Sequence, residues 1–296
     1  MFLSGSITAL ATPFAPDGRL DLEAWSRLLA AQVEAGTSAV VVAGSTGEAA
    51  ALADDEYATL LRAAVAQVAG RIPVLAGTGQ SATAATIART RLARDLGADA
   101  ALVVTPPYVR PTQEGLVAHY TAVAGQGGLP VVLYNVPGRT GCDMQPETVA
   151  RLCRHPGIIA LKEARGDEER WNALYPLAGS GFSLLSGDDP TFVRAMLGGA
   201  QGVISVASNV VPRSFARLCR LAAEGEAGQA QALDARLHEL YDVLGIEPNP
   251  IPVKAILALQ GIGHGLRLPL LPLSPPHQAR AEAMARTCTQ MEAELA

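Results

Sequence analysis

The sequence is short of several residue types, and each shortage limits what the protein can be. Aromatic residues make up 4% of the 296 residues, so the core must be built from small aliphatic side chains, which the 49% hydrophobic content supplies. The four cysteines, Cys142, Cys153, Cys219 and Cys288, are widely spaced without a C-x-x-C pair, which argues against a disulfide framework or a zinc site. No apolar run reaches the roughly 18 residues that a membrane span requires.

Net positive charge and targeting signals are lacking as well. The formal net charge is -5 and the pI is near 5.6, which argues against a general nucleic-acid surface. The N-terminus, Met1 to Gly5, has no basic region followed by an apolar core, so no signal peptide is predicted. We therefore expect a soluble cytoplasmic protein that acts on small molecules and binds neither nucleic acid nor membrane.

Lysine is the scarcest charged residue. Only Lys162 and Lys254 occur among the 23 basic residues, and the other 21 are arginine. Arginine stays protonated, whereas a desolvated lysine can lose its proton and attack a carbonyl carbon. Lys162 ends the apolar run 157–161, which predicts a buried strand that delivers the amine at its C-terminal end. A strand-end lysine that simply reaches solvent is the alternative interpretation of this residue alone.

Eight short apolar runs alternate with longer helical patterns along the chain. Runs of this kind predict strands buried on both faces, as in a parallel sheet. Eight strand–helix units within about 225 residues predict an α/β fold, a (β/α)8 TIM barrel, rather than an open doubly wound sheet, because no glycine-rich phosphate loop follows the first run. The predicted strands cover residues 6–10, 39–43, 72–76, 101–104, 131–134, 158–161, 182–185 and 202–205.

The remaining chain divides into expected helices and a C-terminal appendage. Helical patterns at 21–35 and 54–69 end at glycine, and one at 81–96 has Ser81 in a capping position. Residues 226–296 are expected to form a helical region beside a catalytic barrel of residues 1–225. The glycines at 261–265 follow no strand, so they predict no nucleotide site.

Chemistry-bearing side chains follow several of the predicted strands. Ser45 and Thr46 follow the second strand, Tyr134 and Arg139 the fifth, and Lys162 the sixth. In a TIM barrel these positions meet at one end. Burial disfavours the ammonium form of Lys162, so its neutral amine can form a Schiff base with a ketone, without a metal or other cofactor. A tyrosine hydrogen-bonded to a hydroxyl can relay the proton, and an arginine offers a fork for a carboxylate.

Four motifs resemble the dihydrodipicolinate synthase family of pyruvate-dependent class I aldolases from about Gly5 to Ile262. The loop Gly44-Ser45-Thr46-Gly47-Glu48 is similar to the family's pyruvate-carboxylate loop. The other three segments are 134–141, 159–164 and 249–254, which resemble its tyrosine–arginine signature, its Schiff-base strand and its C-terminal motif. The resemblance implies a lyase of lysine and diaminopimelate biosynthesis that condenses pyruvate with L-aspartate 4-semialdehyde to 4-hydroxy-tetrahydrodipicolinate.

The resemblance also implies roles for individual residues. Lys162 would bind pyruvate covalently, and Tyr134, Ser45 and Tyr108 would form a proton relay, with Tyr108 supplied by the neighbouring subunit of a homotetramer built as a dimer of dimers. The pyruvate carboxylate would be held by Ser45 and Thr46. The remaining substrate-binding positions are Arg139 for the carboxylate of the semialdehyde, the Ile204 carbonyl, and Gly187 after the seventh strand.

Two departures from the family pattern affect the interpretation. Ser45 stands where many synthases have threonine, so the loop also suits sister enzymes such as N-acetylneuraminate lyase or 2-keto-3-deoxy sugar acid aldolases. Arg139, in contrast, favours the synthase. After the synthase and the sister aldolases, a non-catalytic paralogue is the third possible function.

The second departure concerns regulation. At the positions of the family's lysine-feedback pocket the chain has Asp54, Tyr57, Ser81, Ala85 and Pro107. Ala85 lacks the carboxylate that would pair with lysine's ammonium, which predicts weak or absent feedback.

Overall fold

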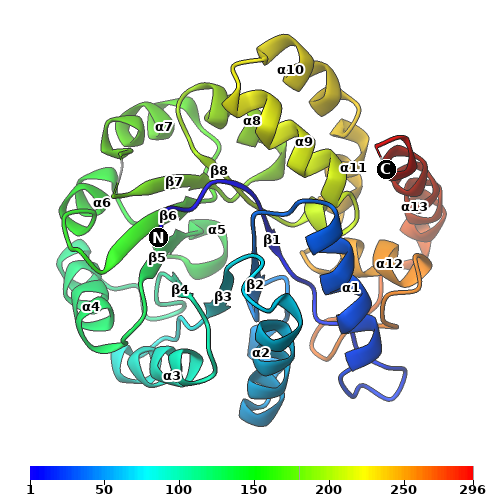
Figure 1. The fold of residues 1–296 in the computed structure, drawn as a ribbon. Coiled ribbons are helices and arrows are strands. Elements are labelled where there is room, and N and C mark those ends of the chain that lie inside the picture. Colours follow the sequence, from blue (N-terminus) through cyan, green and yellow to red (C-terminus); the bar gives the residue numbers. More distant parts are fainter. Residues whose placement is uncertain (180, 296) are drawn as a thin grey trace.

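Eight parallel strands close into a barrel in the computed structural model, which describes residues 1–179 and 181–295. Figure 1 shows the strands in a ring with helices around them. Each strand pairs with its sequence neighbour, and β1 pairs with β8 to close the ring. The predicted TIM barrel is therefore confirmed. The strands are β1 (Gly5–Ala9), β2 (Ala39–Val42), β3 (Val74–Gly77), β4 (Ala100–Val104), β5 (Val131–Asn135), β6 (Ile158–Glu163), β7 (Ser183–Ser186) and β8 (Gly202–Ser205).

Each predicted strand is present, with two informative shifts in the bounds. The third strand was expected to begin at Ile72 but begins at Val74, after Pro73, which has no N–H to donate to a neighbouring strand. The sixth strand continues through Lys162 to Glu163. Lys162 therefore lies within a paired strand and not beyond its end, because Tyr134 and Asn135 of β5 pair with both residues.

The helices follow the strands as expected, although one cap differs. Asp21 and Thr112 cap α1 and α4 by accepting hydrogen bonds from the N–H groups of Ala24 and Gly115. The residue before α3 is Ala82, and the Ser81 hydroxyl instead donates to the Pro107 carbonyl at 3.0 Å. The helices are α1 (Leu22–Glu34), α2 (Asp54–Val68), α3 (Thr83–Asp95), α4 (Gln113–Gln126), α5 (Pro137–Thr140), α6 (Pro146–Leu152), α7 (Glu168–Leu174), α8 (Phe192–Leu197), α9 (Pro212–Ala223), α10 (Ala227–Ala235), α11 (His238–Leu244), α12 (Ile251–Leu259) and α13 (Pro275–Glu294).

Side-chain alternation along the strands produces two apolar layers. In β1, Ile7 and Ala9 belong to the cluster that fills the barrel, whereas Thr8 faces outward and donates a hydrogen bond to Gln32 of α1 at 2.7 Å. The larger cluster lies between the strands and the helices and includes Trp25 and Phe215. Small aliphatic residues supply most of the barrel interior, as the low aromatic content predicted.

The C-terminal helices α10 to α13 lie along one side of the barrel, next to α1 and α9 (Figure 1). The segment before α12 reaches the end of the barrel where the strands finish, which we call the mouth. There the Asn249 amide donates to the Thr46 hydroxyl at 3.1 Å, and Arg139 donates to the Asn249 carbonyl at 3.0 Å. None of the helices in the described part of the chain is both long and apolar enough to span a membrane.

Candidate active site

Lys162 points into the barrel from β6, directly beside Tyr134 of β5. The two residues are paired in the strand register, and the Nζ of Lys162 lies 4.3 Å from the centroid of the Tyr134 ring. Both side chains are buried, at 4% and 7% exposure. The parallel pairing of β5 and β6 therefore brings together two groups that are 28 positions apart in the sequence.

The two lysines of the chain are placed in different electrostatic environments. Lys254 of α12 forms a buried ion pair with Glu48, and its Nζ lies 4.2 Å from the centroid of the Phe14 ring. Burial lowers the pKa of Lys254, and Glu48 opposes that shift. Lys162 has no carboxylate within ion-pairing distance in residues 1–179 and 181–295. Lys162 is thus the buried amine that no acidic group neutralises.

Gly187, after β7, makes room for the stem of Lys162. A Cβ atom placed on Gly187 would lie 2.7 Å from the Cε of Lys162 and 3.0 Å from its Cγ. Any larger residue would therefore push the lysine away from its position beside Tyr134. Gly187 is therefore placed directly against the lysine side chain.

The outward face of the same strands carries a buried polar network. Glu163 follows Lys162 and points away from the barrel interior, where its carboxylate accepts hydrogen bonds from Asn135 at 3.0 Å and from Arg170 at 2.8 Å. Burial raises the pKa of Glu163, and the Arg170 guanidinium opposes that shift. Asp143 accepts from Arg170 and Asn135 at 2.9 Å and 2.8 Å. These bonds hold the ends of β5 and β6, and with them Tyr134 and Lys162, in fixed register.

A cavity of about 700 Å³ opens at the mouth. Ser45, Tyr134 and Arg139 line it, so three of the eight predicted site residues share this space. The hydroxyls of Ser45 and Tyr134 are not hydrogen-bonded to each other or to any other group in the described chain. The cavity also has walls formed by residues 43–44, 48–52, 77–81, 248–250 and 267–270, and by Arg89, Leu102, Val104, Pro107, Val136 and Thr140.

Three further predicted site residues, Thr46, Ile204 and Tyr108, do not line this cavity. Thr46 is 3% exposed, and its hydroxyl accepts the hydrogen bond from Asn249. Ile204 is fully buried inside the barrel. Tyr108 is 92% exposed and adopts a φ of +73°. Its side chain does not line the cavity of its own chain, so this structure brings Tyr108 to no other site residue.

Sequence reasoning assigned no role to the residues that hold the loop 44–48 in place. Glu48 accepts hydrogen bonds from Lys254 and from the backbone N–H of Arg267 at 3.0 Å, and Asn249 contacts Thr46. The sequence did contain a signal for this contact, because Lys254 is one of only two lysines in the chain. A lysine that is buried requires an acidic partner, and Glu48 is that partner. In residues 1–179 and 181–295, no three His, Cys, Asp or Glu side chains are grouped so that they could hold a metal ion.

Comparison with known proteins places the chain in a family. Residues 2–288 match the model of the Dihydrodipicolinate synthetase family. The chain belongs to that family. It is 65% identical over 293 residues to the 4-hydroxy-tetrahydrodipicolinate synthase of Xanthomonas axonopodis pv. citri (strain 306), covering 99% of this chain and 97% of the relative. It is 61% identical to the synthase of the same name from Stenotrophomonas maltophilia (strain K279a), covering 99% of both chains.

Solved structures of family members share the whole fold. The chloride-inhibited dihydrodipicolinate synthase from Acinetobacter baumannii, complexed with pyruvate, has a TM-score of 0.93 and 40% identity and covers 99% of each chain. Dihydrodipicolinate synthase from Aquifex aeolicus has the same TM-score and identity, covering 97% of this chain and 98% of that one. Membership of the family, predicted from four sequence motifs, is confirmed, and the chain is a lyase-family enzyme of lysine and diaminopimelate biosynthesis.

Proposed function

We propose that the chain condenses pyruvate with L-aspartate 4-semialdehyde to 4-hydroxy-tetrahydrodipicolinate, through a Schiff base on Lys162. The observation that carries this proposal is the buried, unpaired amine of Lys162 at 4.3 Å from the Tyr134 ring, next to a cavity of about 700 Å³. Relatives that are 65% and 61% identical over nearly the full chain carry the synthase name. Arg139 at the mouth favours the synthase over a sugar-acid aldolase, because its guanidinium suits a carboxylate.

The chemistry follows from the environment of the amine. The neutral amine of Lys162 attacks the ketone carbon of pyruvate and water leaves, which gives a protonated imine that withdraws electrons from the neighbouring methyl group. Loss of a methyl proton then gives an enamine, whose carbon attacks the aldehyde of the second substrate. Tyr134 is the phenol beside the amine, and Ser45 is the exposed hydroxyl at the same cavity. We assign proton transfer to these two groups and to Tyr108 of a second subunit.

The substrate carboxylates are assigned to the cavity wall. Ser45 and Thr46 lie on the loop that Glu48 and Asn249 hold, and they are the proposed contacts of the pyruvate carboxylate. Arg139 is exposed at the mouth and directs one nitrogen to the Asn249 carbonyl, which leaves further donors of its guanidinium fork for the carboxylate of the semialdehyde. The Ile204 carbonyl and Gly187 complete the proposed substrate site.

Incubation with pyruvate and borohydride tests the covalent step. We expect mass spectrometry to find one reduced pyruvate adduct on Lys162, no adduct on Lys162→Arg, and an adduct on Lys254→Met because Lys254 is held in its ion pair. A substrate panel then tests the assignment of the second substrate: aspartate semialdehyde should be consumed only with pyruvate, and N-acetylneuraminate and deoxy-keto sugar acids should remain uncleaved. Cleavage of a sugar acid, or an adduct on Lys162→Arg, would contradict the proposal.

We further propose that the protein works as a cytoplasmic homotetramer built as a dimer of dimers. Tyr108 and Val109 are exposed at 92% and 52%, and a partner subunit would cover them and receive Tyr108 in its site. A monomeric dihydrodipicolinate synthase variant is among the structural relatives, so sedimentation distinguishes two states. Sedimentation should give the tetramer mass.

The proposed cytoplasmic location is supported by the cysteines. All four are free, which suits a reducing compartment. The proposal includes the division into a barrel, 1–225, and a helical region, 226–296.

Lysine feedback is proposed to be weak or absent. Ala85 lacks the carboxylate that would pair with lysine's ammonium, and Pro107 stands where lysine-inhibited members of the family have a tyrosine. Arg89 places a cation in the cavity wall, over the Tyr57 ring at 4.3 Å and 3.1 Å from Asp54. Arg89 thereby engages the Asp54 carboxylate, which could otherwise attract the ammonium group of lysine. A lysine titration of activity should show little inhibition, and strong inhibition at millimolar lysine or below would overturn this prediction.

A further inference from the structure

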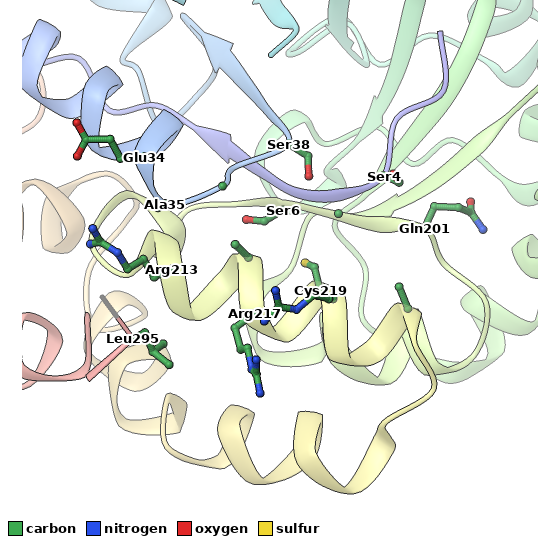
Figure 2. Close-up of a pocket in the computed structure, with 15 residues that line it drawn as sticks. Ser4, Ser6, Glu34, Ala35, Ser38, Gln201, Arg213, Arg217, Cys219 and Leu295 are labelled. Atoms are coloured by element: carbon green, nitrogen blue, oxygen red, sulfur yellow. The ribbon is translucent and has the colours of Figure 1, made fainter. Parts of the chain in front are cut away.

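A second cavity, of about 680 Å³, lies at the opposite end of the barrel from Lys162. Its walls come from residues before or at the start of strands, Ser4 to Ser6 at β1, Ser38 before β2 and Gln201 before β8, whereas Lys162 is the penultimate residue of β6. Helix α9 forms the facing wall (Figure 2). Because all eight strands run parallel, this cavity is separated from the mouth by the packed interior of the barrel.

The α9 wall carries a row of three arginines. Arg213, Arg217 and Arg220 follow one another at spacings of four and three, which places them on one face of the helix over about 10 Å. None of the three guanidinium groups forms an ion pair or hydrogen bond within the described residues. Among the described residues that line the cavity, Glu34 is the one with an acidic side chain. The nearby Glu292 carboxylate instead accepts hydrogen bonds from the backbone N–H groups of Arg213 and Ser214. Three arginines and one glutamate therefore give the described lining a net positive formal charge.

A buried hydroxyl on the other wall also lacks a partner. Ser6 of β1 is 1% exposed, and its Oγ has no hydrogen-bond partner among the described residues. Figure 2 shows Ser6 on the strand side of the cavity, with α9 opposite. Buried polar groups in folded proteins are nearly always hydrogen-bonded, so an unpaired hydroxyl in a cavity wall indicates a position that a ligand oxygen can satisfy. This observation is independent of the arginine row.

We propose that this cavity binds a small phosphorylated molecule, with the phosphate oxygens against Arg213, Arg217 and Arg220 and with Ser6 as a further donor. Guanidinium groups pair in a bidentate manner with phosphate oxygens, and a row of about 10 Å is longer than one phosphate group needs. A diphosphate group presents oxygens on two phosphorus atoms, so it can contact more than one arginine of the row. The site is distinct from the cavity that holds Arg139, and binding there requires no turnover by the enzyme.

Calorimetric titration of the intact protein with pyrophosphate tests the proposal. We expect saturable binding that weakens at least ~tenfold in Arg217→Gln/Arg220→Gln, because two charged hydrogen-bond donors are lost. The matched control is Arg286→Gln, which removes an exposed arginine of α13 outside the cavity and should leave the affinity unchanged. Ser6→Ala should weaken binding about fivefold, the effect of one hydrogen bond, without unfolding the chain.

Four outcomes would overturn the proposal. The first is the absence of saturable pyrophosphate binding, and the second is an affinity that is unchanged in Arg217→Gln/Arg220→Gln or in Ser6→Ala. The third is equally strong binding of citrate, which would show no preference for phosphate. The fourth is loss of binding in Arg139→Gln, which would place the anion at the mouth. Adduct formation on Lys162, measured on the same samples with pyruvate and borohydride, reports separately on the proposed reaction.

Discussion

Replacing Gly187 by alanine tests whether the position of Lys162 limits the reaction. The added Cβ would lie 2.7 Å from the Cε of Lys162, and ordinary contact begins at 3.4 Å, so the lysine stem must retreat by about 0.7 Å. The backbone at Gly187 does not have a positive φ, so alanine fits the main chain. A misplacement of about 1 Å in a reacting group costs about 100-fold in rate, which corresponds to about 2.7 kcal/mol of transition-state stabilisation.

The assay separates this displacement from unfolding. We expect the rate of borohydride-trapped imine formation and kcat/KM to fall together by about 100-fold in Gly187→Ala. The Tm should change little, because the nearest obstructing atoms belong to the flexible Lys162 side chain and the nearest backbone atom, the Cα of Ala164, lies at 3.3 Å. Gly125→Ala in α4 is the control, since a Cβ there meets nothing within 4 Å. It should keep full activity and gain about 0.5–1 kcal/mol in stability. A Gly187→Ala enzyme with the wild-type rate of imine formation would refute the reasoning.

Three further predictions concern the mouth, the loop and a buried histidine. Arg139→Ala should reduce kcat/KM for aspartate semialdehyde by at least ~tenfold while pyruvate adduct formation persists; equal losses in both assays would remove its assigned role. Lys254→Met should cost about 3–5 kcal/mol in urea unfolding because Glu48 is left buried and unpaired, and Glu48→Gln/Lys254→Met should lose less than the two single changes combined. Burial lowers the pKa of His119 to about 4 from 6.5. As the pH falls, the unfolded state therefore takes up a proton on His119 at a higher pH than the folded state does. On the order of 2 kcal/mol of the free energy of unfolding should be lost as pH falls from 6.5 to 4. His119→Asn should lack this component, and a stability difference between the two proteins that does not change over that range would contradict it.

The fold was largely predictable because its signals are local. Eight apolar runs with helical patterns between them indicated the barrel, and the structure contains a strand at each run. The errors occur where one residue changes the backbone or its partner. Pro73 delays β3, Lys162 is followed by one more paired residue, and Ser81 bonds to Pro107 in place of capping α3. Each of these depends on a contact with another segment and not on the local pattern.

The site was predictable to the extent that residues follow strands. Ser45, Tyr134 and Arg139 line one cavity, and Lys162 lies beside Tyr134, because the ends of parallel strands meet in a closed barrel. The support for the loop was not predictable, since Glu48 and Lys254 are 206 positions apart and meet only when the C-terminal helices pack beside the barrel.

The sequence by itself determined the parallel barrel, the family and Lys162 as the candidate for the reactive amine, because apolar periodicity and the scarcity of lysine are visible without coordinates. Only the tertiary structure decided which lysine is neutralised by a carboxylate, which hydroxyls face the cavity, and where unpaired arginines collect at the far end. Pairing, burial and charge depend on distances between segments remote in the chain, and those distances exist only after the barrel has closed.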